Sequence, residues 1–155
     1  MFKRFLPALA ALLVVSVMLV ACGDETAAVP TYTGATSVTV PTDFSTQISS
    51  GLQSSKLKNA KIEAYKTSDD ATKVKSGLVD GFSKGGWNDA TSTLLGASGG
   101  DALKAFDQTG GFILGYEKGN KAAAVMAFPG QLASAVGFKD VGDKDVVYLV
   151  MSGNG

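Results

Sequence analysis

The sequence predicts an α+β fold: a two-layer domain in which one main helix packs on one face of a mainly antiparallel sheet of about four strands. Three observations predict it. Residues Ala60–Lys66 alternate between apolar and polar side chains, which is typical of a half-buried strand. Apolar residues then recur every four positions across 74–82, as on the buried face of a helix. Two β-prone runs, 111–118 and 121–128, follow with only two residues between them, which predicts a hairpin.

The chain begins with the layout of a secretory signal peptide. Lys3 and Arg4 precede an apolar run from Phe5 to Val20 that is interrupted only by Pro7 and Ser16. The run is shorter than the roughly 20 residues that span a bilayer comfortably, and small residues follow it. The sequence therefore predicts that residues 1–21 are a signal peptide and that the rest of the chain is exported.

The end of this run, Leu19-Val20-Ala21-Cys22, resembles the lipobox of bacterial lipoprotein signal peptides, and Cys22 is the only cysteine of the chain. The resemblance implies cleavage between Ala21 and Cys22 and attachment of acyl chains to Cys22, the new first residue. Several acyl chains hold a protein durably on a membrane, whereas one myristoyl-sized chain binds reversibly. The alternatives are a plain signal peptide with an incidental Cys22 and an uncleaved membrane anchor.

A tether is predicted for residues 22–36, because this stretch is rich in Ala, Thr, Pro and small polar residues. The predicted domain covers 37–155 and opens with a short β-prone stretch, Ser37–Val40. Apolar residues at i, i+4 and i+8 from Phe44 then predict a short amphipathic helix that begins at Thr42 or Asp43.

The main helix is predicted to begin at Ser68-Asp69-Asp70, with Ser68 capping free N–H groups and the two carboxylates complementing the helix dipole. Its buried face carries Val74, Leu78 and Phe82, and Gly85-Gly86 supplies the left-handed residue that ends a helix. Gly77 and Gly81 lie inside the helix, where glycine is unfavourable. They predict a helix face pressed closely against a neighbouring element.

The last third of the chain reads as a series of short elements. Asn88–Leu95 is assigned a short strand, and Asp101 caps a brief helix. Gly119-Asn120 suits a type II′ hairpin turn. One helical turn or two are expected over 131–136, a polar turn over 140–145, a central strand covered on both faces over Val146–Met151, and a frayed end from Gly153.

Composition excludes several classes of function. The 14 Lys and Arg balance the 14 Asp and Glu, and no basic run gives a footprint for nucleic acid. The chain has no His, the commonest general base near neutral pH and the commonest metal ligand, and one Cys cannot form a zinc cluster. The spacing of Asp140, Asp143 and Asp145 does not match an EF-hand calcium loop, and turns favour Asp for other reasons. We therefore expect no cofactor, no metal and no enzymatic activity.

The sequence thus predicts a protein anchored to the extracytoplasmic face of a bacterial membrane, with a non-enzymatic binding or scaffold domain of unknown specific role. Its expected partners are the membrane, through the lipid on Cys22, and another envelope protein. The alternative function is that of a carrier for a small apolar ligand or lipid. A third hypothesis is a weak hydrolase or metal-dependent enzyme. The weak candidates for ligand contact are Trp87, Tyr65 and Tyr116, which core packing explains equally well.

Overall fold

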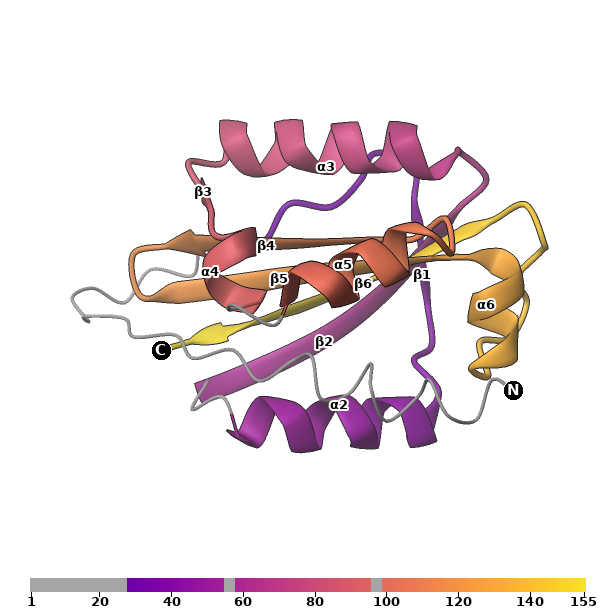
Figure 1. Cartoon of the computed structure of the whole chain (residues 1–155), viewed down its shortest axis with the longest axis horizontal. Helices are drawn as coiled ribbons and strands as arrows, with labels where there is room; N and C mark the ends of the chain where they lie inside the picture. The colour runs from indigo at the N-terminus through magenta and orange to yellow at the C-terminus, as the bar shows by residue number, and fades with distance from the viewer. Residues whose placement is uncertain (1–27, 55–57, 96–98) are drawn as a thin grey trace.

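The computed structural model describes residues 28–54, 58–95 and 99–155, and shows a six-stranded antiparallel sheet between two layers of helices (Figure 1). None of the helices in these ranges is both long and apolar enough to cross a bilayer. The sheet has the order β1-β2-β6-β5-β4-β3. Its strands are β1 (Thr36–Val38), β2 (Lys58–Thr67), β3 (Asn88–Asp89), β4 (Phe112–Lys118), β5 (Lys121–Pro129) and β6 (Val146–Asn154). The helices are α2 (Thr42–Ser54), α3 (Ala71–Lys84), α4 (Thr91–Leu95), α5 (Gly99–Asp107) and α6 (Gly130–Ala135).

The α+β class and the antiparallel sheet are confirmed, but the predicted number of strands and the single helical layer are wrong. The sheet has six strands, and helices cover both of its faces. The central strand β6 shows why. Val147 and Leu149 are buried on one face of the sheet, and Tyr148 and Val150 are buried on the other. A strand that is apolar on both faces needs a layer of helices on each side.

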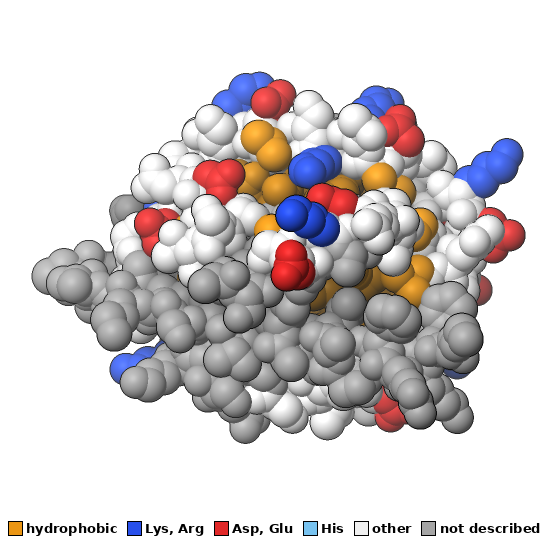
Figure 2. All heavy atoms as spheres, in the orientation of Figure 1, with side chains coloured by type: hydrophobic (Ala, Val, Ile, Leu, Met, Phe, Trp, Pro, Cys, Tyr) orange, Lys and Arg blue, Asp and Glu red, His pale blue; other side chains and the backbone are white. Residues whose placement is uncertain are grey.

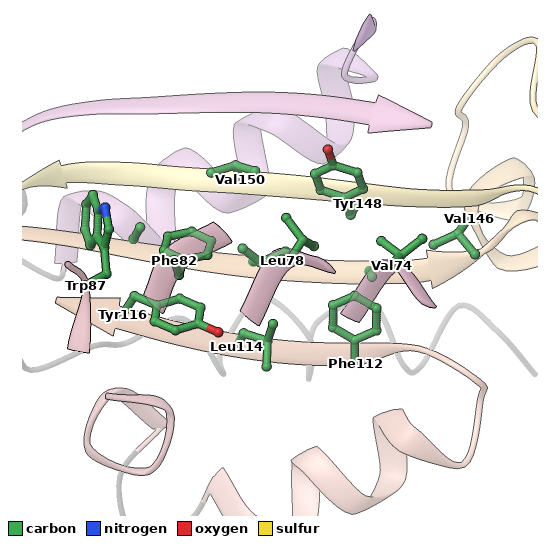
Figure 3. Close-up of a cluster of buried hydrophobic side chains, with 13 residues drawn as sticks. Val74, Leu78, Phe82, Trp87, Phe112, Leu114, Tyr116, Val146, Tyr148 and Val150 are labelled. Atoms are coloured by element: carbon green, nitrogen blue, oxygen red, sulfur yellow. The ribbon is translucent and has the colours of Figure 1, made fainter. Parts of the chain in front are cut away.

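Helix α3 covers one face of the sheet as predicted (Figure 3). Its fully buried residues Val74, Leu78 and Phe82 pack against side chains from β4, β5 and β6. The cap is Asp70 and not Ser68, because the Asp70 carboxylate accepts a hydrogen bond of 2.9 Å from the backbone N–H of Lys73. The helix ends at Lys84 with Gly85 as its C-cap, and Gly86 follows in the left-handed region with φ of 73°.

The second face of the sheet is covered by α2, α5 and α6, which surround Phe128 of β5. The Phe44 ring of α2 lies 5.8 Å from the Phe128 ring, and the Phe106 ring of α5 lies 5.5 Å from it, both edge to face. Helix α6 adds the fully buried Ala133. The predicted amphipathic helix from Thr42 is confirmed. Its apolar residues Phe44 and Ile48 are buried between the helix and this second face of the sheet.

The predicted hairpin is confirmed, and it also orders the end of the chain. Of the two turn residues only Gly119 has a positive φ, 59°, as a type II′ turn requires. The predicted fraying from Gly153 is wrong, because β6 continues through Asn154 beside β5. The backbone N–H of Gly155 then donates to the carbonyl oxygen of Asn120 at 2.8 Å.

The predicted strand Asn88–Leu95 is only partly present. Asn88 and Asp89 pair with β4, but the chain turns into helix α4 at Thr91. The Asp89 carboxylate accepts a hydrogen bond of 2.8 Å from the backbone N–H of Thr91, which satisfies a donor at the start of the helix. The pairing with β4 therefore stops at Asp89, where the capping hydrogen bond begins the helix.

Residues 29–35, which we name the N-terminal strap, lie against α3 although they fall within the predicted tether. Tyr32 ties the strap down: its N–H donates to the Tyr148 hydroxyl at 2.9 Å, and its own hydroxyl donates to Asp69 at 2.8 Å. The close approach predicted for Gly77 is confirmed, because a Cβ there would lie 2.6 Å from the Tyr32 ring. The rest of the predicted tether up to residue 27, with Cys22, lies outside the described residues.

Candidate functional site

A surface groove of about 810 Å³ lies at the β1 edge of the sheet. One wall is formed by β1 and the chain that leads from it into α2. The other wall is formed by the C-terminal side of α6 and the residues after it, and Lys66 of β2 lies between the two. The volume is within the range of binding sites for small molecules and short peptides. The lining residues are Ser37, Val38, Thr39, Val40, Pro41, Thr42, Asp43, Lys66, Val136, Gly137, Lys139 and Asp140.

Two contacts hold the walls of the groove together. Gly137 has a φ of 100°, and a Cβ built on it would lie 3.4 Å from the Cβ of Pro41, so the walls touch at this point. The Lys66 ammonium group donates a hydrogen bond to the backbone carbonyl of Asp140, which itself has a left-handed φ of 57°. Left-handed backbone at a residue other than glycine costs energy and is frequent at binding sites.

The groove runs along the outer edge of β1. This strand has β2 as its only neighbour in the described sheet, so its other edge is unpaired. Ser37 and Val38 are successive residues of β1 and point to opposite faces of the sheet, yet both line the groove, as do Thr39 and Val40 just after the strand. A cavity that contacts both sets of side chains must pass around the edge of the strand.

The lining combines balanced charge with apolar surface. The charged residues of the lining are two lysines, Lys66 and Lys139, and two aspartates, Asp43 and Asp140. Valine and proline side chains supply the apolar part, and three hydroxyl groups supply neutral donors and acceptors. This lining suits a ligand that has hydrogen-bonding groups of both kinds and apolar side chains. An extended polypeptide is such a ligand.

The sequence-predicted aromatic candidates lie away from this groove. Trp87 and Tyr116 are 5% and 3% exposed and pack on either side of Phe82 in the core under α3 (Figure 3). The Tyr116 ring stacks on the Phe82 ring at 3.9 Å, and the Trp87 ring meets it edge to face at 5.6 Å. Tyr65, half-buried on β2, stacks on the Tyr148 ring at 5.3 Å. The structure therefore uses all three residues in packing.

Two polar atoms in this core, the Tyr116 hydroxyl and the Trp87 indole Nε1, are buried without a hydrogen-bond partner in the described part of the chain. They belong to side chains on either side of Phe82. Burial raises the pKa of Tyr116 to about 12, and the nearby charge of Asp89 adds to this shift. A buried hydroxyl that loses its water and gains no partner destabilises the folded state.

We expect Tyr116→Phe to raise the free energy of unfolding at neutral pH by about 1 kcal/mol, because it removes this buried hydroxyl. The neutral phenol is favoured by folding, since the pKa of Tyr116 is about 12 in the fold and about 10 when unfolded. The free energy of unfolding of the unmodified protein is therefore unaffected by this group below pH 10. It falls as the pH rises from 10 toward 12, because the phenol ionises more readily in the unfolded chain. Urea unfolding across this pH range should show a smaller decrease in the free energy of unfolding for Tyr116→Phe than for the unmodified protein. A less stable variant at neutral pH would contradict the assignment of an unpaired hydroxyl.

A second surface lies between α3 and the α4–α5 pair, where Figure 2 shows apolar side chains with charged side chains interspersed among them. Part of it is explained by a local contact: the Lys75 ammonium group lies over the Phe112 ring, 5.9 Å from its centroid. Such cation–π contacts stabilise exposed positions. The charged groups divide this surface into small apolar areas, so the groove at β1 is the candidate site that we pursue.

Acidic side chains form no metal site in the ranges that the structure describes, since no three of them come together in a way that could hold an ion. Asp145 has a structural contact, because its carboxylate accepts a hydrogen bond of 2.7 Å from the backbone N–H of Gly142. Asp69 has another, and hydrogen bonds from Lys73 and then Tyr32 hold its pKa below the usual value. These aspartates stabilise loops and helix ends.

The predicted lipidation and cleavage residues, Cys22 and Ala21, lie outside the described residues. The groove was missed in the sequence, because its walls come from segments about 100 residues apart and contain no catalytic or ligand-binding motif. In comparisons with known proteins, no family model matches the chain, and neither a curated protein nor a solved structure shows significant similarity to it.

Proposed function

We propose that this chain is a lipid-anchored protein of the bacterial cell envelope whose domain is a non-enzymatic binding module for an extended peptide segment of another envelope protein. The lipobox-like Leu19-Val20-Ala21-Cys22 supports the anchor, because every position fits the pattern and Cys22 is the only cysteine. The groove at the β1 edge supports the binding role.

The observation that carries the binding role is the unpaired outer edge of β1 inside a groove. An unpaired strand presents N–H and C=O groups to which an extended peptide can add as a further strand. The side chains of such a peptide alternate, so some would meet Val38 and Val40 and others would meet the hydroxyls of Ser37 and Thr39. Main-chain hydrogen bonds would give affinity, and these two sets of contacts would give selectivity.

The lining gives no reason to expect catalysis. A nucleophilic serine or threonine needs an adjacent base. Ser37, Thr39 and Thr42 are the hydroxyl residues of the groove, and the nitrogen bases that line it are Lys66 and Lys139. The Lys66 ammonium group is already bonded to the Asp140 carbonyl. We therefore assign the groove to binding.

The test is photo-crosslinking in the host, with a photoreactive amino acid at Thr39 in the groove. The matched control carries the same residue at Val79, an exposed position on α3. We expect one adduct of defined mass from the Thr39 position and none from Val79, with mass spectrometry placing the crosslink in one short segment of an envelope protein. The absence of a selective adduct at Thr39 would contradict the proposal. A crosslink from Thr39 to a lipid would instead show that the groove binds an apolar ligand and not a peptide.

A further inference from the structure

The N-terminal strap lies in a slot beside α3 that two glycines of this helix form. Tyr32 lies at Gly77, where a Cβ would be 2.6 Å from its ring, and Pro30 lies at Gly81, 3.3 Å from where a Cβ would be. The strap therefore runs antiparallel to α3, and the chain then continues into β1 (Figure 1). Glycine stabilises a helix less than alanine does, so α3 is weakened at the two positions where the strap approaches it.

The strap is held on α3 by few contacts. The N–H of Tyr32 donates to the Tyr148 hydroxyl at 2.9 Å, and the Tyr32 hydroxyl donates to Asp69 at 2.8 Å. The half-buried apolar residues of the strap pack against the core under α3, but none of the residues 29–35 is fully buried. A segment with few buried apolar contacts opens at a lower free energy than the whole domain does. The strap can therefore undock while the sheet remains folded.

Strand β1 follows the strap without a linker. Ala35 is the last residue of the strap, and its N–H donates to the carbonyl of Tyr32 at 3.2 Å. β1 pairs with β2 over three residues, and none of the β1 residues is fully buried. A strand this short and this exposed has little stability of its own. Its position therefore depends on what holds it at each end, which is the strap before it and the contact of Pro41 with Gly137 after it.

The groove depends on β1 in the same way. More than half of the lining residues belong to the unbroken run 37–43, which begins two residues after Ala35. A peptide that adds to the edge of β1 forms its main-chain hydrogen bonds with an extended strand, and a strand that is already held in place binds more tightly than one that must first be ordered. The strap and the peptide-binding edge are therefore parts of one continuous segment.

We propose that the strap is a conformational switch for the groove. Docked on α3, it holds β1 in the arrangement that binds a peptide, and undocked, it releases β1 and weakens binding. This inference rests on the proposed function of the groove. Because the peptide binds the docked state, its apparent dissociation constant rises as the docked fraction falls, and a bound peptide in turn favours docking. The strap lies between Cys22 and the rest of the domain in the sequence, so the proposed lipid anchor would influence the groove through it.

Two substitutions undock the strap by different means. Gly77→Ala adds a methyl group that would lie 2.6 Å from the Tyr32 ring, and alanine favours the helix that carries it. Tyr32→Ala removes the ring and the hydroxyl that donates to Asp69. The matched control is Gly100→Ala, which adds the same methyl group in α5, where no atom would lie within 4 Å of it.

Hydrogen exchange of the full mature protein, purified from its host in mild detergent, measures how often β1 opens. We expect the amides of residues 36–40 to exchange about tenfold faster in Gly77→Ala and Tyr32→Ala than in the unmodified protein, because contacts that dock the strap are lost. Unchanged exchange of these amides in both variants would overturn the switch.

A second control separates opening of β1 from unfolding of the whole domain. Ile113→Val removes a methyl group from the core on the face of the sheet opposite the strap, so it lowers the free energy of unfolding and leaves the strap in place. We expect the amides of residues 36–40 to exchange at the unmodified rate in this variant. Equal acceleration in Ile113→Val and in the two strap variants would show that β1 opens only with the whole domain, and would overturn the switch.

The same variants, combined with a photoreactive amino acid at Thr39, measure binding in the host. The yield of the selective adduct should fall by up to about tenfold in Gly77→Ala and Tyr32→Ala and stay unchanged in Gly100→Ala. Faster exchange of β1 without loss of the adduct would overturn the switch. The absence of a selective adduct from the unmodified protein would instead contradict the proposed function, and faster exchange of β1 would then still support control of this strand by the strap.

Discussion

Replacing Cys22 with alanine is expected to abolish stable membrane attachment. In the proposed lipid anchor the thiol forms the thioether to a diacylglyceryl unit, and no other residue of the chain can replace it, since Cys22 is the only cysteine. We expect the variant either in the soluble fraction or as an unprocessed precursor that keeps residues 1–21. Fractionation of the host, followed by intact-mass measurement of each fraction, distinguishes these two forms.

The matched control for this variant is Gly23→Ala, which changes the neighbouring residue and leaves the thiol in place. We expect it to remain lipidated and membrane-bound. The domain of the Cys22→Ala variant should unfold at the same urea concentration as that of the control, because the substitution leaves every core residue of the described domain unchanged. Full membrane retention of Cys22→Ala with normal processing would refute the lipid anchor.

Gly130→Ala is expected to lower the free energy of unfolding by about 3 kcal/mol. A Cβ at this first residue of α6 would lie 1.9 Å from the carbonyl oxygen of Gly142. The approach is this close because the Gly130 N–H donates to the Asp145 carbonyl at 2.7 Å, which joins α6 to the loop before β6. The methyl group would force this loop away and break the hydrogen bond. Urea unfolding monitored by circular dichroism measures the effect.

Gly100→Ala is the matched control for Gly130→Ala, because the two variants add the same methyl group. A Cβ at Gly100 would have no atom within 4 Å, and the residue lies in helix α5. Alanine is favoured over glycine in a helix, so this variant should unfold at an equal or higher urea concentration. If both variants unfolded like the unmodified protein, the close contact of α6 with the loop would be disproved.

Local patterns in the sequence were sufficient for the elements whose burial is decided by their own residues. The four-residue repeat of Val74, Leu78 and Phe82 specifies one buried helix face, and the structure confirms it. Gly119-Asn120 specifies a hairpin because a tight turn needs a positive φ. The doubly apolar Val146–Met151 was correctly predicted as a central strand covered on both faces.

The two helical layers were not predicted, although the central strand contained the necessary information. A periodic pattern shows that a helix has an apolar face, but it does not show which face of the sheet that helix covers. The helix from Thr42 could have joined α3 on one face, and its contact with Phe128, far along the chain, places it on the other. The groove depends on long-range pairing as well, because the pairing of β2 with β6 brings Lys66 near the loop that contains Asp140.

The N-terminal strap also determines how the domain would respond to mechanical force. Tension applied to the chain before Ala28 reaches the strap before it reaches the sheet, and Tyr32 resists it through the bonds to Tyr148 and Asp69. β1 comes next along the chain and pairs with β2 over only three residues. A pull from the N-terminal side would therefore first peel the strap and then β1, the strand that borders the groove. In the proposed function, load on the lipid anchor would therefore release the bound peptide before the remaining sheet unfolds.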